Sequence, residues 1–352
     1  MPTPNPDLYA PEAFTPEGVL REASRPTDAL LATLGQYGMV HPLLDGSTLG
    51  LAPVAASSDL DSRAHAARAA KDERIGRIFG ELGSTPEGKT LVEVYTRAHE
   101  ASSQLFALVR EPVPSLEDPR LLEALGRVQP LFERMKALDL QPEITIYPHH
   151  RTAGWWQTVA DAVQNSPLNH NNILKNGGLW MADEVRDKWE AVTGPHNHAP
   201  SWKLQVSSGS EAPAVVNVTS YGYNDQENKT PSPELNHLLG KLGQPLVPDR
   251  TGSQKPGRFG RPAPAITPPA LVQPDIHPEI EGYLTHQFAR IIQKQPPLDS
   301  NSWSWLKGEL PSGRAPRGVW NPDHGQVYLN WRGAGNLLGR LGVRPAGRGQ
   351  GL

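Results

Sequence analysis

The 352-residue sequence contains no cysteine. Disulfide bonds, thiol nucleophiles, zinc sites with cysteine ligands and iron–sulfur clusters are therefore excluded. A bound metal would have to be held by His, Asp and Glu side chains, so any cofactor is expected to be a divalent metal on such ligands. No other cofactor is indicated.

Long apolar runs are also missing. No stretch approaches the 18 or more apolar residues of a membrane span, and the start MPTPNPDLYAPEAFTPEG has neither the basic region nor the apolar core of a cleaved signal peptide. We therefore expect a soluble, cytoplasmic protein that makes no contact with a membrane. A non-cleaved export signal in the N-terminal arm is the alternative.

The common catalytic motifs are absent as well. The sequence has no GxSxG elbow or SxxK pair for a serine nucleophile, and no GxxxxGK[ST] or helix-opening GxGxxG for nucleotide phosphates. With no recognisable catalytic signature, whether the protein is an enzyme stays open. The main hypothesis is a bacterial-type interaction or binding protein whose partner is another protein.

Proline and glycine are plentiful, with 36 and 33 residues, and apolar residues make up only 37%. This composition is typical of folded domains joined by linkers. The predicted organisation is a flexible arm at 1–26, a helical domain at 27–141, a mixed domain at 142–244, a Pro-rich linker at 245–275, a helix with a small β unit packed on the mixed domain at 276–346, and a disordered tail at 347–352.

Cap signals and apolar periodicity predict the helices of the second region. Thr85 followed by Pro86, and Asp118 followed by Pro119, each place a capping side chain before a proline suited to the first helical turn. Together with an apolar stripe over 59–82, they predict an antiparallel helical bundle.

The remainder predicts antiparallel hairpins packed on helices, so the fold class is α+β. Expected helices cover 153–165 and 180–193, and two more begin at Ser232 and after Pro278. Expected strands are a short one at 143–147, a hairpin joining Trp202–Val206 to residues 214–223 across SSGSEAP, and a hairpin around the turn NPDHG.

Histidines are concentrated between Ile144 and Tyr223. His196 and His198, two residues apart in an extended segment, would point to the same side, and with His149 or His150 they could hold a divalent metal. This motivates a metal-dependent hydrolase or nuclease as an alternative function. Loop histidines beside Pro and Trp more often pack or form hydrogen bonds, and that is the main interpretation.

Aromatic residues cluster again near the C-terminus. Such side chains either fill the core of a small β unit or form a recognition surface for a partner. The candidate partner-binding residues are Trp303, Trp305, Trp320, Tyr328 and Trp331.

Charge is distributed unevenly, although the net charge is only −3. From Leu246 onward, thirteen Lys and Arg residues face seven Asp and Glu residues. The basic C-terminal third therefore favours an anionic partner, and nucleic-acid binding there is the second alternative function.

Overall fold

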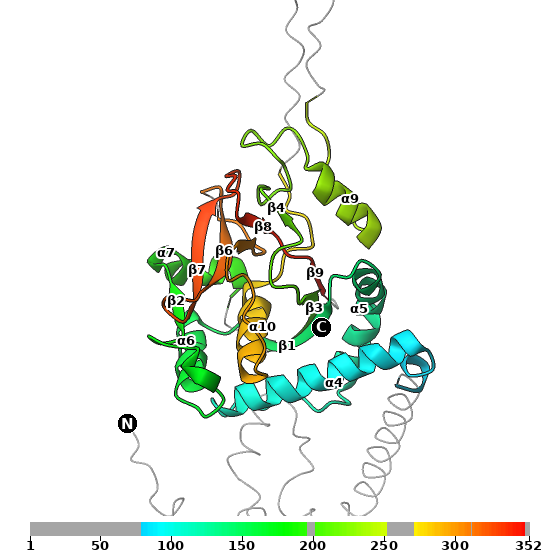
Figure 1. Ribbon diagram of the computed structural model, residues 1–352, viewed down its shortest axis with the longest axis vertical. Coiled ribbons are helices and arrows are strands. Elements are labelled where there is room, and N and C mark those ends of the chain that lie inside the picture. Colours follow the sequence, from blue (N-terminus) through cyan, green and yellow to red (C-terminus); the bar gives the residue numbers. More distant parts are fainter. Residues whose placement is uncertain (1–78, 196–200, 252–270, 311, 349–352) are drawn as a thin grey trace, which may run out of the picture. The chain divides into compact units, whose positions relative to one another are not determined.

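The computed structural model describes residues 79–195, 201–251, 271–310 and 312–348 (Figure 1). All of them fall within one compact unit. This part of the chain is α+β, with helices, an antiparallel sheet and a mixed sheet. The predicted arm, and the part of the predicted helical domain that precedes residue 79, lie outside the described residues. None of the helices in the described ranges is long and apolar enough to cross a membrane.

The capped helices at the start of the described chain are confirmed as α4 (Pro86–Ala107) and α5 (Pro119–Ala137). The side chains of Thr85 and Asp118 each accept a backbone N–H of the first turn, as the cap signals predicted. Pro130 lies inside α5. Their buried apolar side chains include Leu91, Tyr95, Leu105, Leu122, Leu125 and Phe132.

A three-stranded antiparallel sheet lies against these helices, and α4 packs on β1 and α5 on β3. Its strands are β1 (Pro142–His149), β3 (Ser201–Ser208) and β9 (Ala346–Arg348), in the order β1-β3-β9. Gly347 and Arg348, which we expected in a disordered tail, belong to β9. The paired residues Ile144 and Val206, and Ile146 and Leu204, join the core beneath α4 and α5.

The hairpin predicted across SSGSEAP is wrong. β3 pairs with β1 and β9, whereas the following strand β4 (Val215–Val216) pairs with β8 (Leu341–Val343) in another sheet. The guanidinium of Arg344 donates hydrogen bonds of 2.6 Å to the carbonyls of both Ser208 and Ser210. These distant contacts direct the loop away from the local pairing that its turn residues favoured.

The second sheet has six strands and is mixed. In spatial order they are β2 (Leu179–Met181), β7 (Gln326–Gly333), β6 (Arg314–Asn321), β5 (Trp303–Trp305), β8 and β4. The pairs β2–β7 and β5–β8 are parallel, and the others are antiparallel. The β6–β7 pair is the hairpin predicted around NPDHG, and Gly325 adopts the positive φ that its tight turn requires.

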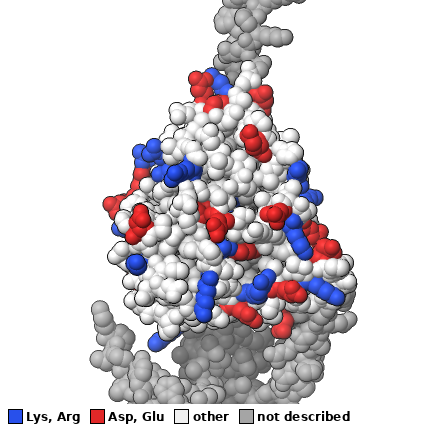
Figure 2. Space-filling model, in the orientation of Figure 1, with Lys and Arg blue, Asp and Glu red and all other residues white. Residues whose placement is uncertain are grey.

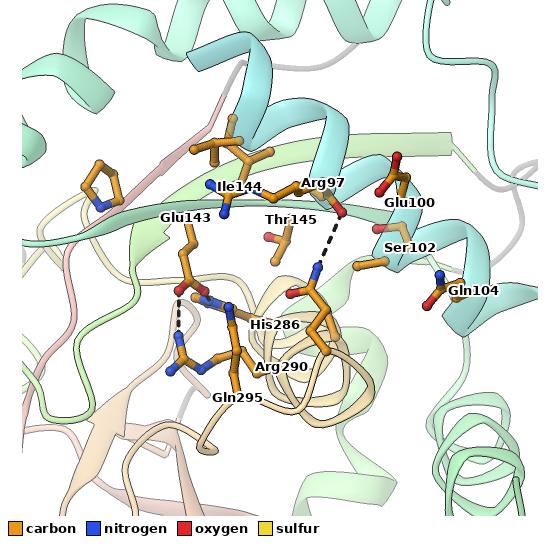
Figure 3. A pocket seen from close by; sticks show the side chains of 16 residues that line it. Arg97, Glu100, Ser102, Gln104, Glu143, Ile144, Thr145, His286, Arg290 and Gln295 are labelled. Carbon is orange, nitrogen blue, oxygen red and sulfur yellow. Dashed lines mark hydrogen bonds and ion pairs between the residues drawn. The ribbon is translucent and has the colours of Figure 1, made fainter. Parts of the chain in front are cut away.

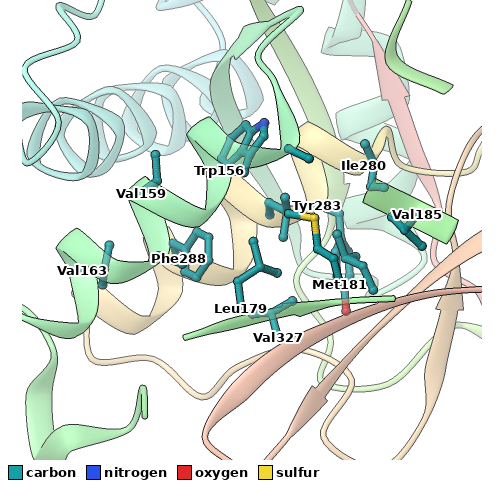
Figure 4. Packing of buried hydrophobic residues seen from close by; sticks show 14 of the residues in the cluster. Trp156, Val159, Val163, Leu179, Met181, Val185, Ile280, Tyr283, Phe288 and Val327 are labelled. Carbon is teal, nitrogen blue, oxygen red and sulfur yellow. The ribbon is translucent and has the colours of Figure 1, made fainter. Parts of the chain in front are cut away.

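Helix α10 (Ile280–Ile292) lies inside the described unit, and all of its residues are buried. It packs on β1, α4, β6 and α6 (Ala153–Gln164). Its contact with α6, β2 and β7 forms the largest described core, shown in Figure 4. That core includes Trp156, Val159 and Val163 from α6, Tyr283 and Phe288 from α10, Leu179 and Met181 from β2, and Val327 from β7.

The helix predicted over 180–193 is only partly observed. The structure has β2, then α7 (Asp183–Asp187) and α8 (Trp189–Thr193). Leu179 and Met181 are buried, whereas Trp180 between them is 40% exposed, which is the alternation of a half-buried strand. Val185 and Trp189 are buried as predicted.

Two shorter elements complete the described chain. α9 (Pro233–Leu242) begins after its cap Ser232 and ends at left-handed Gly243, as predicted. The loop between α6 and β2 contains one 3-10 turn, η3 (His170–Asn172).

The close approach of β6 to α10 gives a first prediction. A Cβ atom at Gly318 would lie 2.3 Å from Cε1 of Tyr283, whose hydroxyl is held 3.0 Å from Asp299 Oδ2. Gly318→Ala should therefore lower the free energy of unfolding by about 1–3 kcal/mol, measured by urea denaturation.

The matched control is Gly126→Ala, the same substitution at a position in α5 where an added Cβ meets nothing within 4 Å. It should raise the free energy of unfolding by about 0.4–1 kcal/mol. Equal effects of the two substitutions would show that Gly318 is not packed against Tyr283.

Candidate functional site

The predicted metal-binding histidines are only partly within the described residues. His196 and His198 lie outside them. His149 and His150, at the end of β1, have ring centroids 3.8 Å apart, and Nδ1 of His149 is hydrogen-bonded to the carboxylate of Glu281 on α10. In the described ranges no group of three or more His, Asp or Glu residues is placed to hold a metal ion. The metal site therefore stays a prediction.

The acids beside His149 already have protein partners. Glu279 accepts hydrogen bonds from the Tyr147 hydroxyl at 2.8 Å, from Lys203 Nζ at 3.2 Å and from Arg348 at 2.5 Å. Burial by itself would raise the pKa of Glu279, but Lys203 and Arg348 outweigh it and lower that pKa. A cavity of about 400 Å³ opens here, and its charges are largely compensated from within the protein.

A second cavity of about 400 Å³ lies between α4, β1 and α10 (Figure 3). Glu143 projects into it from β1, where it accepts hydrogen bonds from His286 Nε2 at 2.5 Å and from Arg290 at 2.6 Å. Other polar side chains around it are Arg97, Glu100, Ser102, Gln104, Gln293 and Gln295.

The same histidine continues the hydrogen-bonded chain inward, because its Nδ1 lies 2.9 Å from the hydroxyl of Ser207 on β3. Serine, histidine and glutamate in this order are the residue types of a hydrolytic triad. Ser207 is fully buried, however, so no substrate can reach its oxygen, and the end that faces the cavity is the carboxylate. The chain therefore links β1, β3 and α10 and does not supply an accessible nucleophile.

The protonation states fit a structural role. Burial lowers the pKa of His286 against the opposing effect of Glu143, so the ring is neutral at neutral pH. A neutral ring that donates from Nε2 to Glu143 accepts a hydrogen bond from the Ser207 hydroxyl at Nδ1. For Glu143, burial would raise the pKa, but the hydrogen bond from His286, the charge of that ring once it is protonated at acid pH, and the charge of Arg290 lower it to about 2.

This carboxylate gives a second prediction. Glu143→Gln leaves the buried Arg290 without its counter-charge, and we expect a loss of about 3 kcal/mol in the free energy of unfolding at neutral pH. Since the folded pKa lies below the unfolded one, the stabilisation is present above about pH 4.3 and is lost as pH falls toward 2. The difference between wild type and variant should therefore shrink in urea titrations repeated at acid pH.

Glu100→Gln is the control, because this exposed acid lines the same cavity. It should change the free energy of unfolding by no more than about 0.5 kcal/mol. A Glu143→Gln effect that is equally small, or that does not depend on pH, would contradict the assignment.

The predicted aromatic partner-binding residues divide into two groups. Trp305, Trp320 and Trp331 are at most 5% exposed, and the indole N–H of Trp305 donates to the Val218 carbonyl at 2.8 Å. These three belong to the cores. Trp303 and Tyr328 are half-buried and reach the surface of the second sheet.

Strand register places Tyr328 and Trp303 on one side of that sheet. Trp180 is paired with Tyr328, and Tyr328 with Val319. Trp303 precedes Ser304, which is paired with Gly318, so Trp303 lies level with Val319. Two residues further along each strand, Asn330 is paired with Arg317. Arg332, two residues beyond Asn330, lies on the same side of β7. We name the set Trp180, Tyr328, Trp303, Arg317 and Arg332 the aromatic–basic face.

Arg317 is the most unusual side chain of this face. It is only 8% exposed, and its guanidinium carbon lies 4.0 Å from the ring centroid of Trp303. Within the described residues no carboxylate pairs with Arg317 or Arg332, and the Nε of Arg317 is buried without an acceptor. Burial, and then the charge of Arg332, lower the pKa of Arg317 to about 10.

Sequence reasoning missed most of this face. Trp180 lies in the range 180–193, for which the sequence predicted a helix, and no sequence pattern singled out Arg317. Alternation could have found it, because Arg317 and Val319 share one side of β6, and Tyr328, Asn330 and Arg332 share one side of β7.

Comparison with models of known protein families, with curated proteins and with solved structures finds no match to this chain.

Proposed function

We propose that this protein is a binding protein that holds an anionic macromolecule on the aromatic–basic face. The observation that carries the proposal is Arg317, a residue only 8% exposed, whose Nε is buried without an acceptor and whose guanidinium has no carboxylate partner among the described residues. Arg332, exposed on the neighbouring strand, adds a second positive charge.

A buried cation is normally paired, because desolvation without a partner costs several kcal/mol. Stacking on Trp303 recovers part of this cost, roughly 0.5–2 kcal/mol. A bound carboxylate, sulfate or phosphate would offset the remaining desolvation cost through the bidentate hydrogen bonds that a guanidinium forms with such groups.

The wider charge distribution supports an anionic partner. In Figure 2, Lys and Arg side chains gather at the upper left, in the region where Figure 1 shows the upper ends of β6 and β7. The acids nearest in sequence to Trp180 pair with arginines outside this face, and Asp183 lies 3.4 Å from Arg186. Glu184 of α7 pairs with Arg314, which alternates onto the opposite side of β6 from Arg317.

Arg317→Met tests the proposal, because methionine keeps an apolar stem beside Trp303 and removes the charge. We expect the variant to elute from heparin, a polyanion, at a lower salt concentration than the wild type. Its free energy of unfolding should stay the same or rise by about 1–4 kcal/mol, since a desolvated charge has been removed. Lost binding together with retained or increased stability distinguishes a ligand-binding residue from a structural one.

Arg314→Gln is the matched control, because it removes one arginine charge from the opposite side of the same strand. Its elution should remain close to that of the wild type. The proposal fails if the wild-type protein is not retained on heparin, or if the two variants lose retention equally.

A further inference from the structure

We infer that the anionic partner is single-stranded nucleic acid, whose bases stack on Trp180 and Tyr328 and whose phosphates contact Arg317 and Arg332. This inference rests on the proposed function and names the chemical class of the partner.

Trp180 and Tyr328 place adjacent aromatic rings at the surface of the second sheet. Trp180 is 40% exposed because strand alternation turns it away from the side of β2 on which Leu179 and Met181 are buried. Its ring centroid lies 4.9 Å from that of Tyr328, with 33° between the ring planes. His324, in the turn after β6, lies beside the pair with its ring centroid 5.7 Å from that of Tyr328. Together they form a continuous aromatic surface.

The two arginines lie near Tyr328 on the same side of the sheet. Tyr328 pairs with Val319, and Arg317 is two residues from Val319 on the same strand. Tyr328 and Arg317 are therefore diagonal neighbours, whose Cα atoms are about 7–8 Å apart. Arg332 is four residues from Tyr328 along β7, about 13 Å at the rise of a strand. These backbone spacings are comparable with the lengths that join bases to phosphates over a few nucleotides, and aromatic side chains on a sheet can stack two or three bases.

Exposed rings favour a single strand over a duplex. A ring can stack only on a base whose face is free, and bases within a duplex are already stacked on their neighbours. A duplex would reach the arginines through its phosphates and leave the rings unused. An acidic protein segment would likewise engage Arg317 and Arg332 but make no use of the paired rings.

The test is fluorescence anisotropy of the full chain with one labelled oligonucleotide, single-stranded as DNA or RNA and then annealed to its complement. We expect tighter binding of the single strands than of the duplex. Trp180→Ala should weaken single-strand binding roughly 5- to 150-fold, the range measured for the loss of one stacked base, and weaken duplex binding much less. Arg317→Met should weaken both.

Val216→Ala is the control, since Val216 is a 46% exposed apolar residue on β4, at the other edge of the same sheet. It should bind like the wild type, and equal thermal midpoints of the variants should show that Trp180→Ala folds.

The outcomes separate this inference from the proposed function. Equal affinity for single strand and duplex, with no effect of Trp180→Ala, would overturn base stacking and leave anion binding intact. The same holds if polyglutamate binds through Arg317 and the oligonucleotide does not, which would identify an acidic protein partner. Failure of the wild type to bind any polyanion would overturn both.

Discussion

The fold depends on the complete burial of α10. An amphipathic helix on a surface leaves one face to water, but α10 is enclosed by β1, α4, α6 and β6, so its polar side chains must find protein partners. Glu281 bonds His149, His286 bonds Glu143 and Ser207, and Tyr283 bonds Asp299, whose carboxylate also holds the buried Arg344. These polar contacts join α10 to β1, β3 and the loop residues Asp299 and Arg344, in addition to its apolar packing.

The features that sequence reasoning predicted are those with local causes. A capping side chain followed by proline determined the starts of α4 and α5, and Ser232 and Gly243 determined both ends of α9. The β6–β7 hairpin followed from alternation on either side of a turn. In each case the residues that determine the element lie within about ten positions of one another.

The errors have long-range causes. The pairing of β3 with β1 and β9 joins residues about 60 and 140 positions apart, and periodicity within one segment carries no information about its partner. Residues 179–181 become a strand because β7 offers a free edge, an effect of the tertiary structure that overrides helical spacing. For the same reason Tyr328 and Trp303 were found as candidates from composition, whereas Arg317 and Trp180 emerged only once the strand register was known.

The position of β9 has a consequence for the synthesis of the chain. Its partner β3 ends at residue 208, but Gln205 of β3 pairs with Arg348, which is synthesised about 140 residues later. At the usual 5–20 residues per second, this edge stays unpaired for roughly 7–30 s on the ribosome. An open strand edge is a template for pairing with other chains. Nascent protein thus passes through a period in which association with its neighbours competes with native closure of the sheet.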